Sequence, residues 1–249
     1  MSYLFHEFLY RPLFNALVFL YDRVTFGDLG IAIIILTILI RFVLYPLFRK
    51  SMRNQMLLQR IQPEVKRIQE HHRDNREKQA QALLALYREH KVNPFSGFLL
   101  LLVQLPILLA LYRVFLNGFS PDSFSDLYSF ISHPEAINAS FIGLLDLTKP
   151  SIVVLGIAAV AQYFQAKSSI PKREEGKEPT PADRIGRQMV FLGPILTIVF
   201  LFKLPAAIGI YWAATSIFSV VQQVFINRSI TRDLGNKYGA VQTKGNEIS

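Results

Sequence analysis

The sequence predicts an all-α integral membrane protein with five transmembrane helices, an N-terminal interfacial amphipathic helix and a cytoplasmic helical hairpin. Apolar side chains make up 51% of the 249 residues and the mean hydropathy is +0.29, which is more apolar than an ordinary soluble domain. These apolar residues gather in five segments, each close to the length of about 17 to 25 residues that a membrane span requires. Basic residues concentrate in alternate connections between the segments.

Residues 1–27 predict an amphipathic helix lying in the outer membrane interface. One face of this helix carries the polar residues Glu7, Arg11, Asn15 and Asp22. The other face carries mostly Leu4, Phe8, Leu9, Leu13, Leu17 and Leu20. A cleavable signal peptide is the alternative, but polar residues interrupt its core, and neither a basic start nor a small-x-small cleavage site is evident.

The five predicted spans are residues 28–48, 94–117, 150–167, 189–203 and 205–227. They leave residues 49–92 and 168–188 as cytoplasmic connections, 118–149 as an extracytoplasmic loop and 228–249 as a cytoplasmic tail. The last two spans are separated by a Lys-Leu-Pro corner, where Pro205 lacks an amide hydrogen and is expected to end the helix. One kinked helix is the alternative. The Pro-, Gly- and charge-rich loop after Ser168 and the tail after Arg232 are expected to be flexible.

The distribution of lysine and arginine predicts the orientation. The segment from Arg49 to Lys91 holds eleven of these residues, the segment from Lys167 to Arg187 six, and the tail from Arg228 four. By contrast, only Lys149 is basic between Asn117 and Pro150. The positive-inside rule therefore places the N-terminus outside and the C-terminus in the cytoplasm, which agrees with an odd number of spans.

The cytoplasmic segment 49–92 predicts a helical hairpin with a bend near Pro63. Its first helix repeats apolar residues at helical spacing: Met52, Met56, Leu57, Ile61, Val65 and Ile68. After a polar turn at residues 71–78, its second helix does the same with Ala80, Leu83 and Tyr87. The alternative is a solvated charged loop, since short isolated helices are marginally stable.

Arg41 is the single charge from Leu29 to Phe48, the apolar part of the first predicted span, where an arginine costs roughly 2.5 to 3.5 kcal/mol at the helix centre. The apolar segments 29–48, 95–116, 150–166, 189–203 and 205–226 contain no Asp or Glu, which excludes a salt bridge from Arg41 to a carboxylate inside another span. Two explanations stay open: a water-filled cavity, or a side chain that reaches the headgroups about 10 Å away. The polar residues expected to line such a cavity are Thr37, Arg41, Gln104, Gln162, Gln165, Trp212, Thr215 and Gln222. For each of them alone, ordinary interhelical hydrogen bonding is the alternative.

The sequence contains no constellation that predicts catalysis, a metal site or a cofactor. There is no cysteine, and all five histidines lie outside the spans. The adjacent His71 and His72 lie in a polar turn, where solvated histidines are more common than metal ligands. We therefore expect a protein that is not an enzyme and that binds no metal or cofactor.

Three motifs carry a resemblance to a known family. They are LTILIRFVLYPLFRKSMR (residues 36–53), YREHKVNPFSGFLLLLVQLPILLALYRV (residues 87–114) and PAAIGIYWAATSIFSVVQQVFINR (residues 205–228). The chain resembles the YidC/Oxa/Alb membrane protein insertases over roughly residues 5–230. It resembles the compact bacterial YidC type, lacking an extra N-terminal span and a large periplasmic domain.

The resemblance implies a five-span core with a hydrophilic groove open to the cytoplasm and to lipid. Arg41 and Thr37 match the groove residues of the family, and Tyr211 and Trp212 match its aromatic pair. The second and fourth spans match an apolar slide for the incoming helix. The residues expected to form the slide are Leu101, Leu105, Leu109, Phe191, Ile195 and Ile198.

The function expected from this resemblance is insertion and folding of nascent membrane proteins in the bacterial plasma membrane, without nucleotide hydrolysis. The expected partners are nascent membrane proteins, the ribosome, targeting factors, the Sec translocon and the lipid bilayer, with no direct DNA binding. The short and mildly basic tail predicts weak autonomous ribosome binding. An anion channel or transporter that uses Arg41 is the first alternative function, and a noncatalytic assembly factor is the second.

Overall fold

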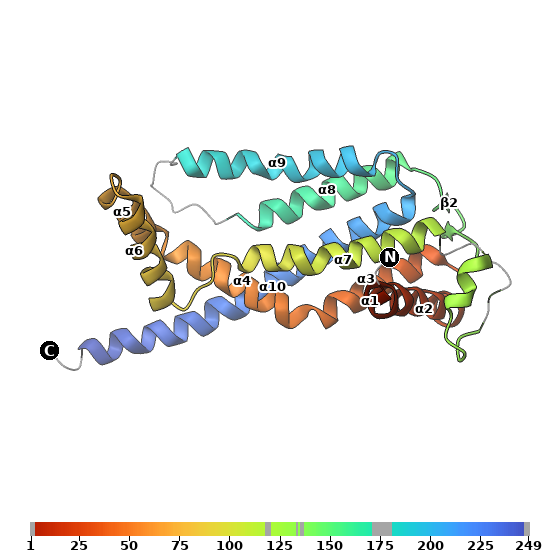
Figure 1. The fold of residues 1–249 in the computed structure, drawn as a ribbon, viewed down its shortest axis with the longest axis horizontal. Coiled ribbons are helices and arrows are strands. Elements are labelled where there is room, and N and C mark those ends of the chain that lie inside the picture. The colour runs from red at the N-terminus through yellow and green to blue at the C-terminus, as the bar shows by residue number, and fades with distance from the viewer. Residues whose placement is uncertain (1–2, 118–120, 133, 135–136, 171–180, 247–249) are drawn as a thin grey trace. The chain divides into compact units, whose positions relative to one another are not determined.

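The computed structural model describes residues 3–117, 121–132, 134, 137–170 and 181–246, and it is built almost entirely of helices (Figure 1). The chain divides into two compact units. The first unit contains Met1–Val43 and Val103–Val221, and the second contains Leu44–Leu102 and Gln222–Ser249. The mostly helical fold predicted from the sequence is confirmed.

The N-terminal segment is helical from Tyr3 to Val24, and its polar face is only partly exposed. It comprises α1 (Tyr3–Phe5), the π-turn η1 (His6–Tyr10), α2 (Arg11–Phe19) and the π-turn η2 (Leu20–Val24). Asn15 is buried: its Nδ2 donates to the carbonyl of Asp126 at 2.9 Å, and its Oδ1 accepts the amide of Tyr128 at 2.7 Å. The exposed side chains of this segment include Tyr3, Leu4, Phe8 and Phe19. Asn15 of the polar face is therefore buried, and the apolar face is divided between the exposed Leu4 and Phe8 and the buried Leu17 and Leu20.

The described part of the connection 118–149 contains η3 (Pro121–Asp126) and a small hairpin, β1 (Ser140–Phe141) and β2 (Leu145–Asp146). The two strands are antiparallel, and Phe141 pairs with Leu145. Asp28 joins this hairpin to the start of α3 (Leu29–Val43), because its Oδ1 accepts the amide of Ile31 at 2.8 Å and its Oδ2 accepts that of Ile142 at 2.6 Å. One carboxylate thus caps a helix and anchors a hairpin.

The same connection also supports the starts of two later helices. The carbonyls of Lys149 and Leu147 accept the amides of Ala206 and Ala207, at 2.9 and 3.1 Å, at the beginning of α10 (Ala206–Asn246). Ser151 is the N-cap of α8 (Ile152–Ser168). Amides that a helix terminus leaves unpaired are satisfied in this way by the loop.

Helix α3 is shorter than the expected span 28–48. It ends at Val43, the helix breaks at Leu44, and α4 (Tyr45–Arg60) follows. Pro46 accounts for the break, because it has no amide to donate to the carbonyl of Phe42 and its ring would clash with that carbonyl. In α4 itself Pro46 stands in the first turn, where proline is tolerated.

The remaining helices of the first unit include α8 and α9 (Pro181–Leu201), which lie side by side (Figure 1). Helix α9 begins eight residues before the predicted span 189–203, with proline at its first position. It ends at Leu201 and α10 begins at Ala206, so the predicted break at the Lys-Leu-Pro corner is present. Residues 171–180 of the predicted flexible loop lie outside the described residues. In the tail after Arg232, which was expected to be flexible, α10 continues as far as Asn246.

By length and composition, two helical stretches among the described residues are able to cross a membrane: Phe98–Leu116 of α7 (Ser96–Asn117) and Ala206–Ile230 of α10. If α3 and α4 are taken as one broken span, they form a third. The apolar helices Ile152–Ser168 and Gln188–Leu201 are shorter. The first apolar segment is thus divided between α3 and the start of α4, and each of the other four lies on one helix.

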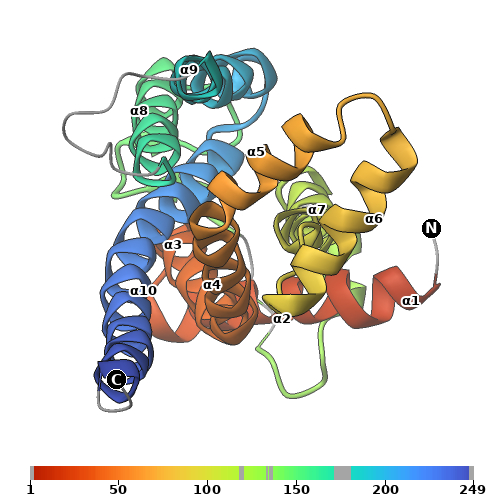
Figure 2. The same ribbon diagram turned by 90° about the vertical axis from the view of Figure 1, so that its left-hand side faces the viewer.

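In the second unit, α5 (Gln62–His71) and α6 (Arg76–Glu89) form the predicted hairpin (Figure 2). Its buried core consists of Ile61, Val65, Leu86 and Val92. The bend falls at Ile61, just before Pro63, and Asn75 caps α6 by accepting the amide of Lys78 at 2.9 Å.

Three residues that the sequence predicted in the apolar interface between the two hairpin helices do not lie there. Met52 and Met56 instead pack against Ile226 and Ile230 of α10, within the same unit. Ala80 is exposed. Helical spacing identified the apolar face of α4, but it carries no information about which helix covers that face.

Candidate functional site

Arg41 lies in the last turn of α3 and is 4% exposed. Tyr211, a buried residue of α10, lies within electrostatic range of this guanidinium. A cation near a helix C-terminus is favoured by the helix dipole, by about 0.3 to 1 kcal/mol, which offsets a small part of its burial cost. Thr37, one turn earlier, is also buried, and its hydroxyl donates to the carbonyl of Ile33 at 2.7 Å.

Gln104 of α7 completes a first polar group, in which its side-chain amide donates a hydrogen bond to the hydroxyl of Tyr211. We call Arg41, Gln104 and Tyr211 the Tyr211 cluster. Its members come from three helices, α3, α7 and α10, and all belong to the first unit. The cluster combines a fixed positive charge with neutral groups that both donate and accept hydrogen bonds.

Gln162 of α8 is the centre of a second polar group, the Gln162 cluster. Its Oε1 accepts hydrogen bonds from Nε1 of Trp212 at 3.2 Å and from Oγ of Ser216 at 2.9 Å. Gly193 of α9 makes room for it, since a Cβ at this glycine would lie 3.2 Å from Nε2 of Gln162. Because consecutive residues of a helix point about 100° apart, Tyr211 and Trp212 serve different clusters.

The other predicted groove residues are less closely joined. Gln165 follows Gln162 by three residues on α8, and its backbone carbonyl accepts from the Ser169 hydroxyl at 3.1 Å. Thr215 follows Tyr211 by one turn and shares its face of α10. Gln222 is buried, but it belongs to the second unit. The structure thus gathers five of the nine predicted groove residues, Arg41, Gln104, Gln162, Tyr211 and Trp212, into two clusters.

The residues predicted to form an apolar slide are on the surface. Leu105 and Leu109 of α7 and Phe191, Ile195 and Ile198 of α9 are between 43% and 56% exposed. The side chain of Leu101 lies outside the described residues. On each helix the exposed positions are three, four or seven residues apart, so they form one face. Such faces suit contact with lipid or with an apolar helix.

An apolar cavity of about 350 Å³ was not foreseen from the sequence. It lies among α3, α8 and α10, and Ala213 and Ala214 leave space between larger neighbours. Other lining residues include Ile34, Ile38, Phe141, Val154 and Phe218. In the sequence, the adjacent small residues Ala213 and Ala214 within an apolar segment were the feature that could have indicated this cavity. The cavity has an apolar lining and does not include Arg41, so it suits an aliphatic group rather than a charged segment.

Among the described residues, no group of three or more His, Asp or Glu side chains is arranged to hold a metal ion. His71 and His72 pack edge to face, with ring centroids 4.8 Å apart. The polar groups of the candidate site are therefore amides, hydroxyls, an indole and one guanidinium. These groups can bind a passing polar segment by hydrogen bonds and charge.

Comparison with known proteins places this arrangement in a family. The sequence profile of the 60Kd inner membrane protein family matches residues 20–233. The chain belongs to the 60Kd inner membrane protein family. The resemblance inferred from the three motifs is thereby confirmed.

Relatives in this family carry the name membrane protein insertase YidC. The protein from Rickettsia bellii (strain OSU 85-389) is 31% identical over 226 residues, covering 88% of this chain and 38% of that protein. The proteins from Hahella chejuensis (strain KCTC 2396) and Pelagibacter ubique (strain HTCC1062) are 32% and 31% identical, covering 88% and 91% of this chain. The chain spans 35% and 40% of those two proteins, so it matches less than half the length of each of the three relatives.

A solved structure has the same fold. It is described as an active YidC insertase crystal structure with the first transmembrane domain resolved. The TM-score is 0.57 at 26% identity, and the match covers 85% of this chain and 45% of that one. The helices that carry both polar clusters thus belong to a fold that is known in an insertase.

Proposed function

We propose that this chain inserts membrane proteins into the lipid bilayer and assists their folding, without nucleotide hydrolysis. Family membership supports this proposal, as do the names of the relatives and of the solved structure. The observation that carries it is the buried Arg41 in a cluster with Gln104 and Tyr211, on helices whose other faces are apolar.

In this mechanism the client's hydrophilic segment meets the two polar clusters while its apolar segment stays in lipid. Arg41 attracts acidic residues of the client, and this attraction is stronger at low dielectric than in water. The apolar helix moves along the exposed faces of α7 and α9. Transfer of apolar surface at about 25 cal/mol per Å² supplies the driving force, so no nucleotide is needed.

The proposed topology has five spans, residues 28–48, 94–117, 150–167, 189–203 and 205–227, with the N-terminus outside and the C-terminus in the cytoplasm. The basic connections support it through the positive-inside rule. The membrane is the bacterial inner membrane, as the family description indicates. The hairpin of α5 and α6 receives clients, targeting factors or the ribosome, and the Sec translocon is a further partner.

Reconstitution tests the proposal directly. The purified chain in liposomes should place a small client with an acidic translocated tail across the bilayer, measured as protease protection of that tail. Empty liposomes and liposomes that hold an unrelated membrane protein are the controls. Anion flux without a client, together with no insertion, is the result expected of a channel and would reject the proposal. If the liposomes show no anion flux and no insertion, that result would favour an assembly factor.

Variants of Arg41 test the role of its charge. Arg41→Lys keeps a cation and Arg41→Ala removes it, and each is assayed on a client with an acidic tail and on one with a neutral tail. We expect Arg41→Ala to reduce insertion of the acidic client by about tenfold, equivalent to about 1.4 kcal/mol in the barrier, with a smaller effect on the neutral client. Equal activity of both variants on the acidic client would mean that Arg41 only reaches toward the headgroups.

A further inference from the structure

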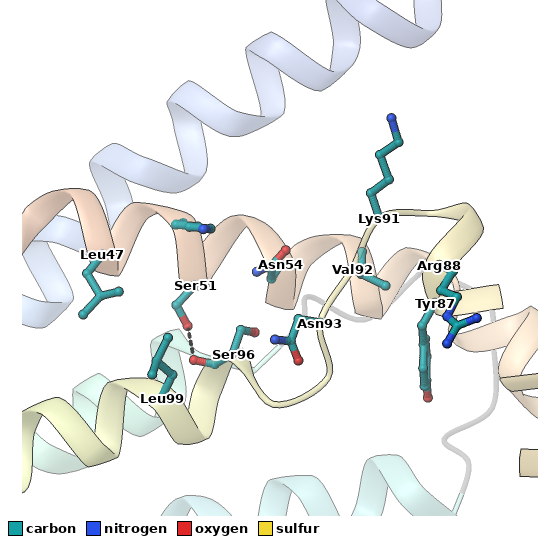
Figure 3. Close-up of a pocket in the computed structure, with 11 residues that line it drawn as sticks. Leu47, Ser51, Asn54, Tyr87, Arg88, Lys91, Val92, Asn93, Ser96 and Leu99 are labelled. Carbon is teal, nitrogen blue, oxygen red and sulfur yellow. Dashed lines mark hydrogen bonds between the residues drawn. The ribbon is translucent and has the colours of Figure 1, made fainter. Parts of the chain in front are cut away.

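A polar pocket of about 350 Å³ lies in the second unit, apart from both clusters of the candidate site (Figure 3). It is formed by α4, the end of α6, the loop that follows α6, and the start of α7. Its lining residues include Lys50, Asn54, Arg88, Lys91, Asn93 and Ser96. The candidate site uses none of them.

The charge of this lining is entirely positive. Lys50, Arg88 and Lys91 contribute three cations, and no Asp or Glu is among the lining residues. Asn54 and Asn93 face the interior between Ser96 and Val92, whereas the ammonium of Lys91 extends outward at the rim (Figure 3). Cations around a concave surface concentrate anions there.

Ser96 provides the observation that points to a ligand. It is 5% exposed, and its backbone carbonyl accepts a hydrogen bond from Oγ of Ser51 at 3.0 Å. Its own hydroxyl is buried and has no hydrogen-bond partner among the residues that the structure describes. A buried polar group without a partner is unfavourable, and an acceptor oxygen in the pocket would remove that cost.

The position of Ser96 adds a second attraction for an anion. Ser96 is the first residue of α7, a helix of 22 residues. Amides at a helix N-terminus lack partners within the helix and point toward the space before it, and the helix dipole is positive at that end. A hydroxyl, amides and three cations are the donors that proteins use to bind phosphate.

The other end of the pocket is apolar. Leu47 and Leu99 lie on the side away from Arg88 and Lys91 (Figure 3). Phe95 and Phe98 beside it are exposed, and the apolar stretch of α7 begins at Phe98. The pocket therefore joins an anion-binding end to the surface at which the chain enters its apolar span.

We propose that this pocket binds the phosphate group of an anionic phospholipid, with the acyl chains lying along Leu99 and the adjacent apolar surface. The proposal rests on the membrane topology of the proposed function, which puts the start of α7 at the cytoplasmic headgroups. The phosphate accepts hydrogen bonds from the hydroxyl of Ser96 and from the amide of Phe98 in the first turn of α7, since the amide of Ser96 itself donates to the carbonyl of Asn93 at 3.2 Å. The cations at the rim hold its charge.

Lys91 offers a variant that separates binding from stability. It adopts φ of +52° at the end of α6, a conformation in which glycine is unstrained and a lysine is not. Lys91→Gly therefore removes a cation and relieves strain at once. Ser96→Ala similarly removes a hydroxyl that is unsatisfied in the unliganded pocket. Neither variant is expected to unfold the protein.

The test measures how much phosphatidylglycerol or phosphatidylcholine stays bound to the purified full chain by native mass spectrometry. The wild type should retain phosphatidylglycerol in preference to phosphatidylcholine. Ser96→Ala should weaken that retention, and Arg88→Gln with Lys91→Gly should weaken it by about tenfold or more, as expected for lost charge-assisted hydrogen bonds. Arg67→Gln with Arg73→Gln, two cations of the hairpin outside the pocket, is the matched control and should retain the lipid.

Three results would overturn the proposal. The first is equal loss of lipid in the pocket pair and the control pair, which indicates general charge attraction. The second is complete displacement of the lipid by inorganic phosphate, which indicates a free-phosphate site. The third is displacement of the lipid by RNA but not by other anions, which indicates a nucleic-acid site. Lipid retention is measured without a client, so a chain that binds lipid but fails to insert would disprove the proposed function and leave this inference intact.

Discussion

At the scale of single residues, Ile142 holds a backbone conformation that its side chain disfavours. It has φ of +53° and precedes Gly143 at +66° in the three-residue connection 142–144 between β1 and β2, where the amide of Leu144 donates to the carbonyl of Phe141 at 3.1 Å. Turns of this kind prefer Asn-Gly, and a left-handed conformation costs an ordinary residue about 1 to 2 kcal/mol. Its side chain is exposed, so little packing offsets that cost.

We therefore predict that Ile142→Asn raises the free energy of unfolding by about 1 kcal/mol. The measurement is denaturant unfolding in detergent followed by circular dichroism. Leu144→Asn is the control, because Leu144 is an exposed apolar residue of the same hairpin without a left-handed backbone. An equal gain in both variants would mean that polarity, rather than turn geometry, stabilises the hairpin.

The Gln162 cluster has a built-in reporter, since Trp212 is the only tryptophan of the chain. Gln162→Leu leaves the indole N–H and the Ser216 hydroxyl without their shared acceptor. We expect a loss of about 1 to 3 kcal/mol of stability and a shift of the Trp212 emission to shorter wavelength. Gln165→Leu, on the same helix, should leave the emission unchanged. The same shift in both variants would contradict the assigned hydrogen bonds.

At the scale of elements, Asp28 joins the start of α3 to the hairpin of β1 and β2 through one carboxylate. Asp28→Ala removes a helix cap and a charged acceptor, so it should lower the free energy of unfolding by about 2 kcal/mol. Asp22→Ala, which removes only a surface pair with Arg23 at 3.1 Å, should change it by less than about 1 kcal/mol. Thermal unfolding of both variants gives the comparison, and equal losses would argue against the cap.

The turn before α8 is predicted to respond to acid. Lys149 Nζ lies 2.8 Å from Asp146 Oδ2, and this bond, with those from Thr148, lowers the pKa of the Asp146 carboxyl from 3.8 to about 2. The carboxylate's contribution to stability is therefore complete above the unfolded pKa of about 3.9 and is lost as the pH falls through 2. In Lys149→Met the pKa of Asp146 should rise toward its usual value, as carboxyl NMR titration would show. An unchanged midpoint would exclude the lysine as the cause.

The sequence was sufficient to predict which segments are helical, but it could not predict what covers each helix face. The helical spacing of apolar residues predicted that Ile61 and Val65 belong to the core of the hairpin. Pro205 predicted the break before α10. The same periodicity assigned Met56 to the wrong partner, because an apolar face does not specify its neighbour. Pro46 was visible in the sequence, yet its effect on the length of α3 was missed.

The candidate site was predictable in part for the same reason. Polar residues within apolar segments are conspicuous, so Arg41, Gln104 and Gln162 could be selected one by one. Their division into two clusters depends on Tyr211 and Trp212 facing different helices, which requires the packing of α7 and α8 around α10. Gly193 gave no signal, because its role is only to leave space for Gln162.

At the scale of the whole molecule, the two units separate the polar clusters from the hairpin. Both clusters and the reporter Trp212 belong to the first unit, whereas α5 and α6 belong to the second and have their own core. Removing the hairpin should therefore leave the local structure of the first unit unchanged. If the hairpin receives clients, its removal should affect delivery and not the clusters.

We predict that replacing residues 62–89 with a short flexible linker lowers insertion of a reconstituted client by at least about tenfold, or about 1.4 kcal/mol in the barrier. The Trp212 emission should stay as in the wild type, because the bonds from Gln162 that fix its environment lie within the first unit. Protease protection of the client and fluorescence of the same sample give both values. Unchanged insertion with unchanged emission would make the hairpin a spacer. The hydrogen bond from Trp212 goes to Gln162, which lies outside the replaced segment. Changed emission would therefore show that the first unit depends on the hairpin for its folding.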